Sequence, residues 1–545
     1  MTTLAPPPTA RGAAVPRDER LVRLAERVGT LSLGPTAAAI GALAALITWL
    51  GSWNPSYWGD EAATVMSAQR PLTALFAELG KVDAVHGLYY FGMHFWIRLF
   101  GASELSTRLP SALAVGAMVA GTVVLGARLA EVRFGILAGV VCAVLPRTTF
   151  MATEARSYAM GTALAVWIMV FFVDLWRRRE FRRRSWVLLG VLVAAASYLF
   201  LYLVLLAAVQ GVVLLATTRG RPLRRRWLQS LGVTAVVVAP IAMLDYSERH
   251  QIAFLARRGY ATAQNVLVDQ WFGMPGVTVT CWALILLGVA VFLVRWRKRS
   301  TTAVLDRRRS DREVLLLGTA WLVLPTALLL AANAVSPTYN TRYLSFCTPA
   351  AALLVAFGLA ALARVATRLM AGRADRAFAG ALPGVTVPAV LVLAVAVFAL
   401  GALALPDYLH DRGAFAKDGG SDWRQTADYL AMQVQSGDAV VFDETTKPSR
   451  RPELAYRLYP QQFAGVTVPE LITPYSHRDH IWDLMAPITE IRSELLSAHS
   501  VWAIELPTGD EVPADVEDLT SHGYRVVGTH LVHRLEVYQL QKEGV

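Results

Sequence analysis

Long apolar runs separated by short polar segments dominate the first three quarters of the chain. A helix needs about 20 apolar residues to cross roughly 30 Å of hydrocarbon. Runs close to that length occur at residues 33–52, 109–127, 134–150, 158–176, 228–244, 279–294, 314–333, 344–363 and 384–405. We therefore predict an α-helical protein that crosses a membrane many times.

A further apolar stretch, Ser185–Thr218, is 34 residues long and exceeds the length of one span. Arginine-rich segments, 177–184 and 219–226, flank it on both sides. Lys and Arg collect in cytoplasmic loops, so both ends are expected on the cytoplasmic side. The stretch is predicted to be a hairpin of two short spans, which gives about eleven transmembrane helices.

The distribution of basic residues predicts the orientation. With eleven spans, the cytoplasmic segments are 1–30, 128–133, 177–184, 219–226, 295–313 and 364–376, and they hold 30 of the 52 Lys and Arg residues. We therefore expect a plasma-membrane protein with a disordered cytoplasmic tail at 1–30 and an extracytoplasmic carboxy-terminal region. The membrane domain is predicted at 31–405. Its first external loop, 53–107, includes an apolar, aromatic segment at 85–100 that is expected to form an interfacial helix.

Residues 406–545 differ in charge and pattern from the rest. They carry 12 Lys and Arg against 22 Asp and Glu, a net of −10, whereas the whole chain has a net charge of +11. A helical pattern at 423–433, short strand patterns at 438–442 and 501–504, and a terminal hairpin at 524–540 predict a small extracytoplasmic α/β domain. Because it has no glycine-rich phosphate loop, nucleophile elbow or HExxH motif, we expect it to cap or bind rather than catalyse.

Composition supports the membrane assignment and excludes other classes. Of the 545 residues, 55% are hydrophobic and only 17% are charged, against about a quarter charged in a soluble domain. The basic residues lie between apolar runs rather than on one soluble face, which argues against nucleic acid as a partner. Three isolated cysteines exclude a disulfide framework and a cysteine-based metal site.

Two adjacent carboxylates, Asp60 and Glu61 in the WGDEAA sequence at 58–63, follow the first span directly. Acidic residues near a membrane face are costly and tend to be functional. A carboxylate beside an acceptor hydroxyl can act as a general base while a nearby cation stabilises a phosphate leaving group. The structural alternative is a helix start, with Asp60 as the N-cap and Glu61 in the first turn.

Other external turns contribute polar residues that can converge with Asp60 on one outward-facing cavity. Arginines suit bidentate capture of a phosphate, and tyrosines suit stacking on a sugar ring. The candidates for donor binding are Lys81, His86, Tyr89, Arg156, Tyr158, Arg342 and Tyr343, with Asp83 and Glu154 in support.

Simpler roles stay open for several of these residues. Glu154 and Arg156 can pair with each other or reach toward lipid headgroups. His86 with Asp83 can bind a metal, although a hydrogen-bonded histidine is the more common case. Arg108, at the start of the second span, is most simply an anchor at the membrane interface.

Taken in order, these motifs resemble the GT-C superfamily of glycosyltransferases that use polyprenyl-phosphate sugars. The resemblance is strongest to the branch that contains protein O-mannosyltransferases and lipid A aminoarabinose transferases. The chain also looks similar to actinobacterial membrane glycosyltransferases. The matching pieces are WGDEA at 58–62, DAVHGLYY at 83–90 with WIRLFGASE at 96–104, TRLPSAL at 107–113, EARSYA at 154–159 and RYLSFCTPA at 342–350. The resemblance covers roughly residues 33–405. It implies the GT-C fold.

The resemblance also implies an inverting transfer in which Asp60 deprotonates the acceptor, Glu61 orients the site, and Arg156 and Arg342 hold the donor phosphate. The chain departs from the aminoarabinose transferases at Ala63, where they carry Arg, and at 83–87, where they carry a Lys-Pro-Pro run. The expected donor is polyprenyl-phosphate mannose, with arabinose on the same carrier as the alternative. The expected acceptor is a cell-envelope glycan, glycolipid or protein.

Rivals from other classes are a lipid or sugar transporter and a non-catalytic envelope scaffold. A transporter would be expected to have ionisable residues near the membrane midplane and an internal repeat. A scaffold would not explain the polar residues in four separate outer turns. No cofactor is required by the pattern. A divalent cation stays an alternative, because Asp60, Glu61, Asp83 and His86 are ligand types that such an ion accepts.

Overall fold

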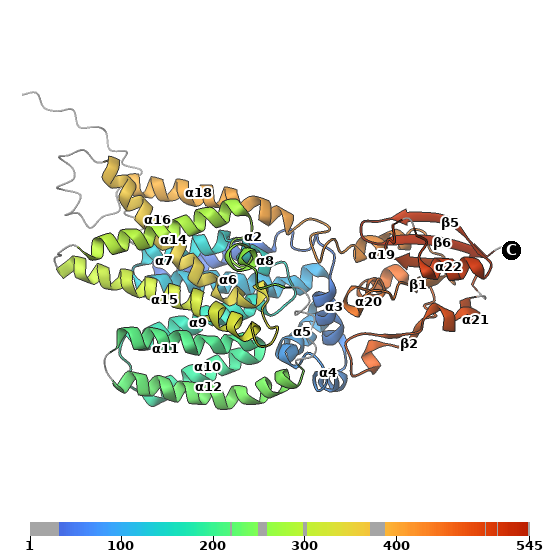
Figure 1. The fold of residues 1–545 in the computed structure, drawn as a ribbon, viewed down its shortest axis with the longest axis horizontal. Helices are drawn as coiled ribbons and strands as arrows, with labels where there is room; N and C mark the ends of the chain where they lie inside the picture. The colour runs from blue at the N-terminus through green and yellow to red at the C-terminus, as the bar shows by residue number, and fades with distance from the viewer. Residues whose placement is uncertain are drawn as a thin grey trace, which may run out of the picture.

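The computed structural model describes residues 32–542 except 219–220, 249–258, 298–301, 371–386, 496–497 and 510. The predicted tail at 1–30 lies outside the described residues. Figure 1 shows a helical bundle, a small α/β region at the carboxy-terminal end, and the helices α3, α4 and α5 at the junction between them. This layout agrees with the predicted fold class.

All eleven predicted spans form helices. Seven helices in the described part of the chain are long and apolar enough to cross a membrane, and the shorter helices α2, α7, α10 and α11 account for the other predicted spans. The bundle consists of α2 (Leu33–Trp49), α6 (Glu104–Leu129), α7 (Val132–Val144), α9 (Tyr158–Arg177), α10 (Arg183–Leu199), α11 (Leu206–Thr217), α12 (Arg221–Ser247), α14 (Pro275–Trp296), α15 (Thr302–Asn333), α16 (Thr348–Met370) and α18 (Val387–His410).

The predicted hairpin at 185–218 turns at Phe200 and the short 3₁₀ segment η2 (Leu201–Leu205). The Phe200 ring packs edge-on against Tyr158 at the start of α9. At the opposite end of α9, Trp176 donates a hydrogen bond to Thr217, the last residue of α11. The chain therefore runs along α9 and back, as the flanking arginines predicted.

One predicted span is broken. The segment 134–150 consists of α7 and a separate short helix, α8 (Pro146–Met151). Leu145 between them is extended, with φ −64° and ψ 135°, because a residue that precedes proline is disfavoured in the helical conformation. The break turns the chain toward the loop that carries residues 153–156.

The predicted first external loop folds into α3 (Gly59–Gln69), α4 (Leu72–Leu79), η1 (Ala84–His86) and α5 (Gly87–Phe100). Helix α5 is amphipathic, with Tyr90 and Met93 buried and Phe95 and Leu99 exposed, as the segment 85–100 predicted. Its buried face packs on α3, which begins at the WGDEA sequence.

The carboxy-terminal region contains a four-stranded sheet in the order β1-β4-β6-β5. Strands β1 (Ala439–Phe442) and β4 (Ser500–Glu505) are parallel, and β5 (Tyr524–Leu531) and β6 (Glu536–Lys542) form the predicted terminal hairpin. Its other elements are α19 (Trp423–Ala431), α20 (Glu453–Leu458), α21 (Arg492–Leu495), α22 (Ala514–Ser521) and the small pair β2 (Leu471–Thr473) and β3 (Leu484–Met485).

This region shares its core with the first external loop. Tyr57, Ala62 and Met66 pack in one buried cluster with Trp423 and Leu454 of the α/β region. The backbone also closes tightly, because a Cβ added at Gly59 would lie 2.2 Å from the carbonyl oxygen of Ser449. The α/β region therefore packs directly on the start of α3.

Candidate functional site

Asp60 stands in the first turn of α3 and is the partly open carboxylate of the site. Its side chain is 32% exposed, and Arg342 Nη1 donates to its Oδ2 at 3.0 Å. Burial disfavours the ionised form, but Arg342 and Arg156 outweigh it and hold the pKa of Asp60 below its usual value. Asp60 is therefore ionised at neutral pH and accessible to a ligand.

Arg342 lies in η5 (Thr341–Cys347), directly before α16. Its guanidinium carbon is 4.8 Å from the Trp58 ring centroid and 5.9 Å from that of Tyr158. Cation–π contacts of this kind fix the plane of the group. Its side chain remains 20% exposed, so both partners of the Asp60–Arg342 ion pair are partly exposed.

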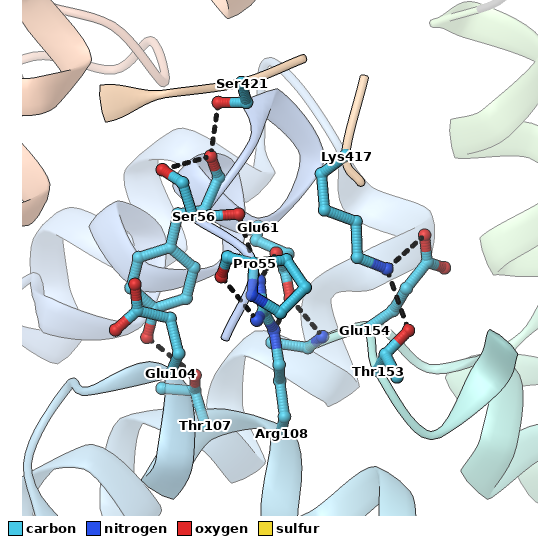
Figure 2. Close-up of polar contacts among 12 residues, drawn as sticks. Pro55, Ser56, Glu61, Glu104, Thr107, Arg108, Thr153, Glu154, Lys417 and Ser421 are labelled. Atoms are coloured by element: carbon cyan, nitrogen blue, oxygen red, sulfur yellow. Dashed lines mark hydrogen bonds and ion pairs between the residues drawn. The ribbon is translucent and has the colours of Figure 1, made fainter. Parts of the chain in front are cut away.

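Glu61 has a different environment although it is the next residue. Its carboxylate is fully buried and accepts two hydrogen bonds from Arg108, at 2.8 and 2.5 Å, and one from the Ala155 backbone N–H at 2.8 Å. Successive helical side chains diverge by about 100°, which separates the two carboxylates. Figure 2 shows Arg108 beneath Glu61, within hydrogen-bonding reach of the 52–56 segment.

The interface-anchor interpretation of Arg108 is wrong. Its side chain is fully buried, and its Nη1 donates to the carbonyl oxygens of Ser52 and Pro55 at 2.7 and 2.8 Å. It ties α6, the loop after α2 and the start of α3 together.

Arg156 lies in the loop between α8 and α9 and is 7% exposed. Its Nη1 donates to the Asp60 carbonyl oxygen at 3.2 Å and to the Tyr90 hydroxyl at 3.1 Å, and its Nη2 donates to His86 Nε2 at 2.8 Å. Tyr90 in turn donates to Asp83 Oδ2 at 2.7 Å. These contacts exclude both simpler roles considered for Arg156, pairing with Glu154 and reaching for headgroups.

His86 and Asp83 each have a hydrogen-bond partner of their own, because Arg156 donates to His86 Nε2 and Tyr90 donates to Asp83 Oδ2. His86 accepts from Arg156, and burial together with the charge of Arg156 holds the pKa of His86 well below its usual value, so the ring is neutral. Asp83 adopts a left-handed conformation, with φ 57°, and burial raises its pKa against the opposing influence of Arg156. Among the described residues, no set of three or more His, Cys, Asp and Glu is placed to hold a metal ion.

Glu154 lies on the other side of Arg342 and is 1% exposed. Its Oε1 is 3.9 Å from Arg342 Nη1 and 3.8 Å from Lys417 Nζ. Burial raises the pKa of Glu154, while Lys417 and Arg342 act in the opposite direction. Its backbone carbonyl accepts from the Ser111 hydroxyl at 2.6 Å, which fixes the loop on α6.

The remaining predicted residues lie at different distances from this centre. Tyr158 contacts Arg342 as described, and Tyr343 stacks on Tyr202 at 5.2 Å between ring centroids. Tyr89 is buried in the core under α5. Lys81 is exposed at the end of α4 and acts electrostatically on Asp479 of the α/β region, so it is not brought to Asp60.

Sequence reasoning missed Tyr90 and Lys417. The sequence places Tyr90 directly after Tyr89, but only the orientation of α5 about its axis decides which of the two hydroxyls binds Arg156. Lys417 lies in the connection after α18 and had no motif around it. The double glycine at 419–420 was the only local signal of a tight turn there.

An apolar cavity of about 140 Å³ borders the site beneath α5. It is lined by Leu88, Tyr89, Gly92, Met93, Trp96, Pro110, Met160 and Leu199. Tyr89 connects it to the polar centre, because Arg156, Glu61 and Glu154 all act electrostatically on its hydroxyl.

Comparison with known proteins gives matches only among solved structures. No family model and no curated protein matches the chain. One similar structure is ArnT from Cupriavidus metallidurans bound to undecaprenyl phosphate, with 14% identity, a TM-score of 0.49, and coverage of 92% of this chain and 97% of that chain. Another is the archaeal oligosaccharyltransferase AglB from Archaeoglobus fulgidus with an inhibitory peptide and a dolichol-phosphate, with 10% identity, a TM-score of 0.46, and coverage of 86% and 69%.

Proposed function

We propose that this protein is a membrane glycosyltransferase that moves a monosaccharide from a polyprenyl-phosphate donor to an acceptor hydroxyl. The observation that carries the proposal is the pairing of Asp60, ionised and 32% exposed, with Arg342 at 3.0 Å. A base and a phosphate-binding cation stand side by side in the same opening. A general base and a cation that stabilises the leaving phosphate both accelerate such a transfer.

In the proposed reaction, Asp60 takes the proton of the acceptor hydroxyl. The hydroxyl oxygen forms a bond to the anomeric carbon of the sugar, and the bond from that carbon to the phosphate oxygen breaks. The electron pair leaves with the polyprenyl phosphate, and the configuration at the anomeric carbon inverts. The low pKa of Asp60 keeps it ready to accept the proton at neutral pH.

The two arginines take unequal parts in this proposal. Arg156 already donates to the Asp60 carbonyl, Tyr90 and His86, so it chiefly shapes the site. Arg342 is more open, with 20% of its side chain exposed. We therefore assign the leaving phosphate to Arg342, and the apolar cavity beside Tyr89 to the first isoprene units of the lipid.

The finer assignments follow from the sequence. Mannose is the preferred sugar, and arabinose on the same carrier is the alternative, because both present the same phosphate and lipid. A cell-envelope glycan, glycolipid or protein would be the acceptor. By the positive-inside rule, the arginine-rich segments support an amino terminus on the cytoplasmic side of the plasma membrane and a site that lies with the α/β region on the outer side.

The test uses purified protein in nanodiscs with radiolabelled decaprenyl-phosphate mannose and, separately, decaprenyl-phosphate arabinose, and measures transfer of label to crude membrane acceptors. Asp60→Asn should abolish transfer while the protein remains folded. Asp428→Asn, at an exposed carboxylate of α19, is the matched control and should transfer normally. Full activity of Asp60→Asn would refute the assignment. Consumption of neither donor by folded protein would favour another lipid-linked sugar first and the transporter second.

A further inference from the structure

The connection between α18 and the α/β region inserts a lysine into the site. Lys417 is only 4% exposed, and its Nζ donates to Thr153 Oγ1 at 2.9 Å. The same Nζ lies 4.9 Å from the Phe150 ring centroid. Figure 2 shows Lys417 descending from the 417–421 segment with its amine directed at Thr153 and Glu154.

The backbone after Lys417 is shaped for this insertion. Asp418, Gly419 and Gly420 have positive φ values of 45°, 72° and 103°, which glycine tolerates and aspartate rarely adopts. The Asp418 carboxylate is paired with Arg450 and Arg534 of the α/β region. The turn after Lys417 is therefore held by the α/β region, while the lysine amine is held by Thr153 and Glu154 of the bundle.

Lys417 and Arg342 approach the same oxygen of Glu154. Glu154 Oε1 lies 3.8 Å from Lys417 Nζ and 3.9 Å from Arg342 Nη1. Arg342 Nη1 is also 3.0 Å from Asp60 Oδ2. Among the described residues, Arg342 is the only other cation within 4.0 Å of Glu154. Because an unpaired buried carboxylate is strongly unfavourable, removal of Lys417 should move the Arg342 side chain from Asp60 toward Glu154.

We propose that Lys417 is a positioning residue that neutralises Glu154 and so leaves Arg342 on Asp60. Its described contacts are with Thr153, Glu154 and the Phe150 ring rather than with Asp60. The expected effect of Lys417 on sugar transfer rests on the proposed function. The arrangement of the four side chains stands independently of the chemistry they serve.

Other charged or titratable groups face these residues. Those facing Asp60 are Arg342, Arg156 and His86, and Tyr158, Tyr343, Asp83 and Glu154 also interact with it. Lys417 faces Glu154, Glu61, Arg108 and Asp411. The hydrogen-bond and ion-pair contacts described for the Lys417 amine are with Thr153 and Glu154, so its removal should reach Asp60 chiefly through Glu154 and Arg342.

The experiment measures the protonation of Asp60 directly. Carbodiimides react with protonated carboxyl groups, so the pH dependence of Asp60 labelling, read by peptide mass spectrometry, gives a midpoint without requiring activity. Full-length wild type, Lys417→Met, Lys417→Arg, Glu154→Gln and the double variant Lys417→Met/Glu154→Gln are compared in nanodiscs. Transfer from the radiolabelled donors is measured on the same samples.

We expect Lys417→Met to raise the labelling midpoint by about one pH unit, the order of shift that a lost neighbouring charge produces. Transfer at neutral pH should fall about tenfold. Lys417→Arg and the double variant should return both values toward wild type, and Glu154→Gln alone should not raise the midpoint. The double variant leaves no unpaired buried carboxylate, so it tests the inference even where Lys417→Met folds poorly.

The outcomes separate the two proposals. An unchanged midpoint in folded Lys417→Met, or a loss of transfer that Glu154→Gln does not repair, would show a merely structural lysine and overturn the inference. A raised midpoint that the double variant reverses supports it even where no donor is consumed. In that case the failure concerns the proposed donors and not the position of Lys417.

Discussion

Replacing Arg108 by methionine tests whether the second carboxylate of the WGDEA sequence is structural. The substitution keeps most of the side-chain volume and removes the cation. It leaves Glu61, which is fully buried, with the Ala155 N–H as its remaining donor among the contacts described above. It also removes donors from the carbonyl oxygens of Ser52 and Pro55.

The expected loss follows from these contacts. Breaking a buried ion pair by removing one partner costs about 3–5 kcal/mol, and each buried carbonyl left without its donor adds about 1 kcal/mol or more. We therefore expect Arg108→Met to lower the free energy of unfolding by at least about 4 kcal/mol. In Arg108→Met/Glu61→Gln the buried negative charge is gone, so the double variant should recover about 2 kcal/mol.

The assay is SDS-induced unfolding of the full-length protein in mixed micelles. Arg98→Met, at an exposed arginine of α5, is the control and should change stability by less than about 0.5 kcal/mol. Asp60→Asn should also unfold close to wild type, although under the proposed function it should abolish transfer. The reasoning would be refuted by an Arg108→Met protein within about 1 kcal/mol of wild type, or by a double variant no more stable than the single one.

Three further predictions concern other contacts. Arg342→Met should raise the pKa of Asp60, because burial then opposes ionisation without the nearby charge of Arg342. The acid limb of the pH–rate profile should move to higher pH by about one unit, and Arg342→Lys should shift it less. Gly59→Ala forces a Cβ to within 2.2 Å of the Ser449 carbonyl oxygen, so it should weaken the docked α/β region by about 2 kcal/mol, seen as faster limited proteolysis of the 411–422 connection. Burial and nearby carboxylates raise the pKa of Glu505 to about 9, so the folded protein holds a proton that the unfolded chain releases near pH 4.5. The free energy of unfolding therefore falls as pH rises between these values. Glu505→Gln should be more stable than wild type by about 3 kcal/mol at pH 8 but not at pH 4.5, as measured by pulse proteolysis.

Features with a strong periodic or compositional signal were predictable from the sequence. The apolar runs predicted the long helices of the bundle in the described part of the chain, and the arginines at 177–184 and 219–226 predicted the reversal at Phe200. The terminal hairpin followed from alternation at 524–540. The break before Pro146 was available from the proline itself, but the length of the apolar run concealed it.

The pairing of charges within the site was not predictable in the same way. Asp60 and Glu61 are neighbours in sequence, yet they face Arg342 and Arg108, which are 282 and 47 residues away. Such partners are set by packing between helices and leave no local pattern. Lys417 is the extreme case, because its burial depends on a turn formed after the last span and fixed by the α/β region.

The pairing of the base with Arg342 has a chemical consequence under the proposed reaction. Proton transfer converts the Asp60 carboxylate into a neutral acid, while the donor phosphodiester, with one negative charge, becomes a phosphate monoester that takes a second. The net charge of the site is thus unchanged, and one negative charge moves from Asp60 to the phosphate. Arg342, at 3.0 Å from Asp60 and with 20% of its side chain exposed, loses one anionic partner as the other develops. A cation held on the base before reaction is therefore released toward the leaving group by the proton transfer, which favours the transition state over the resting site.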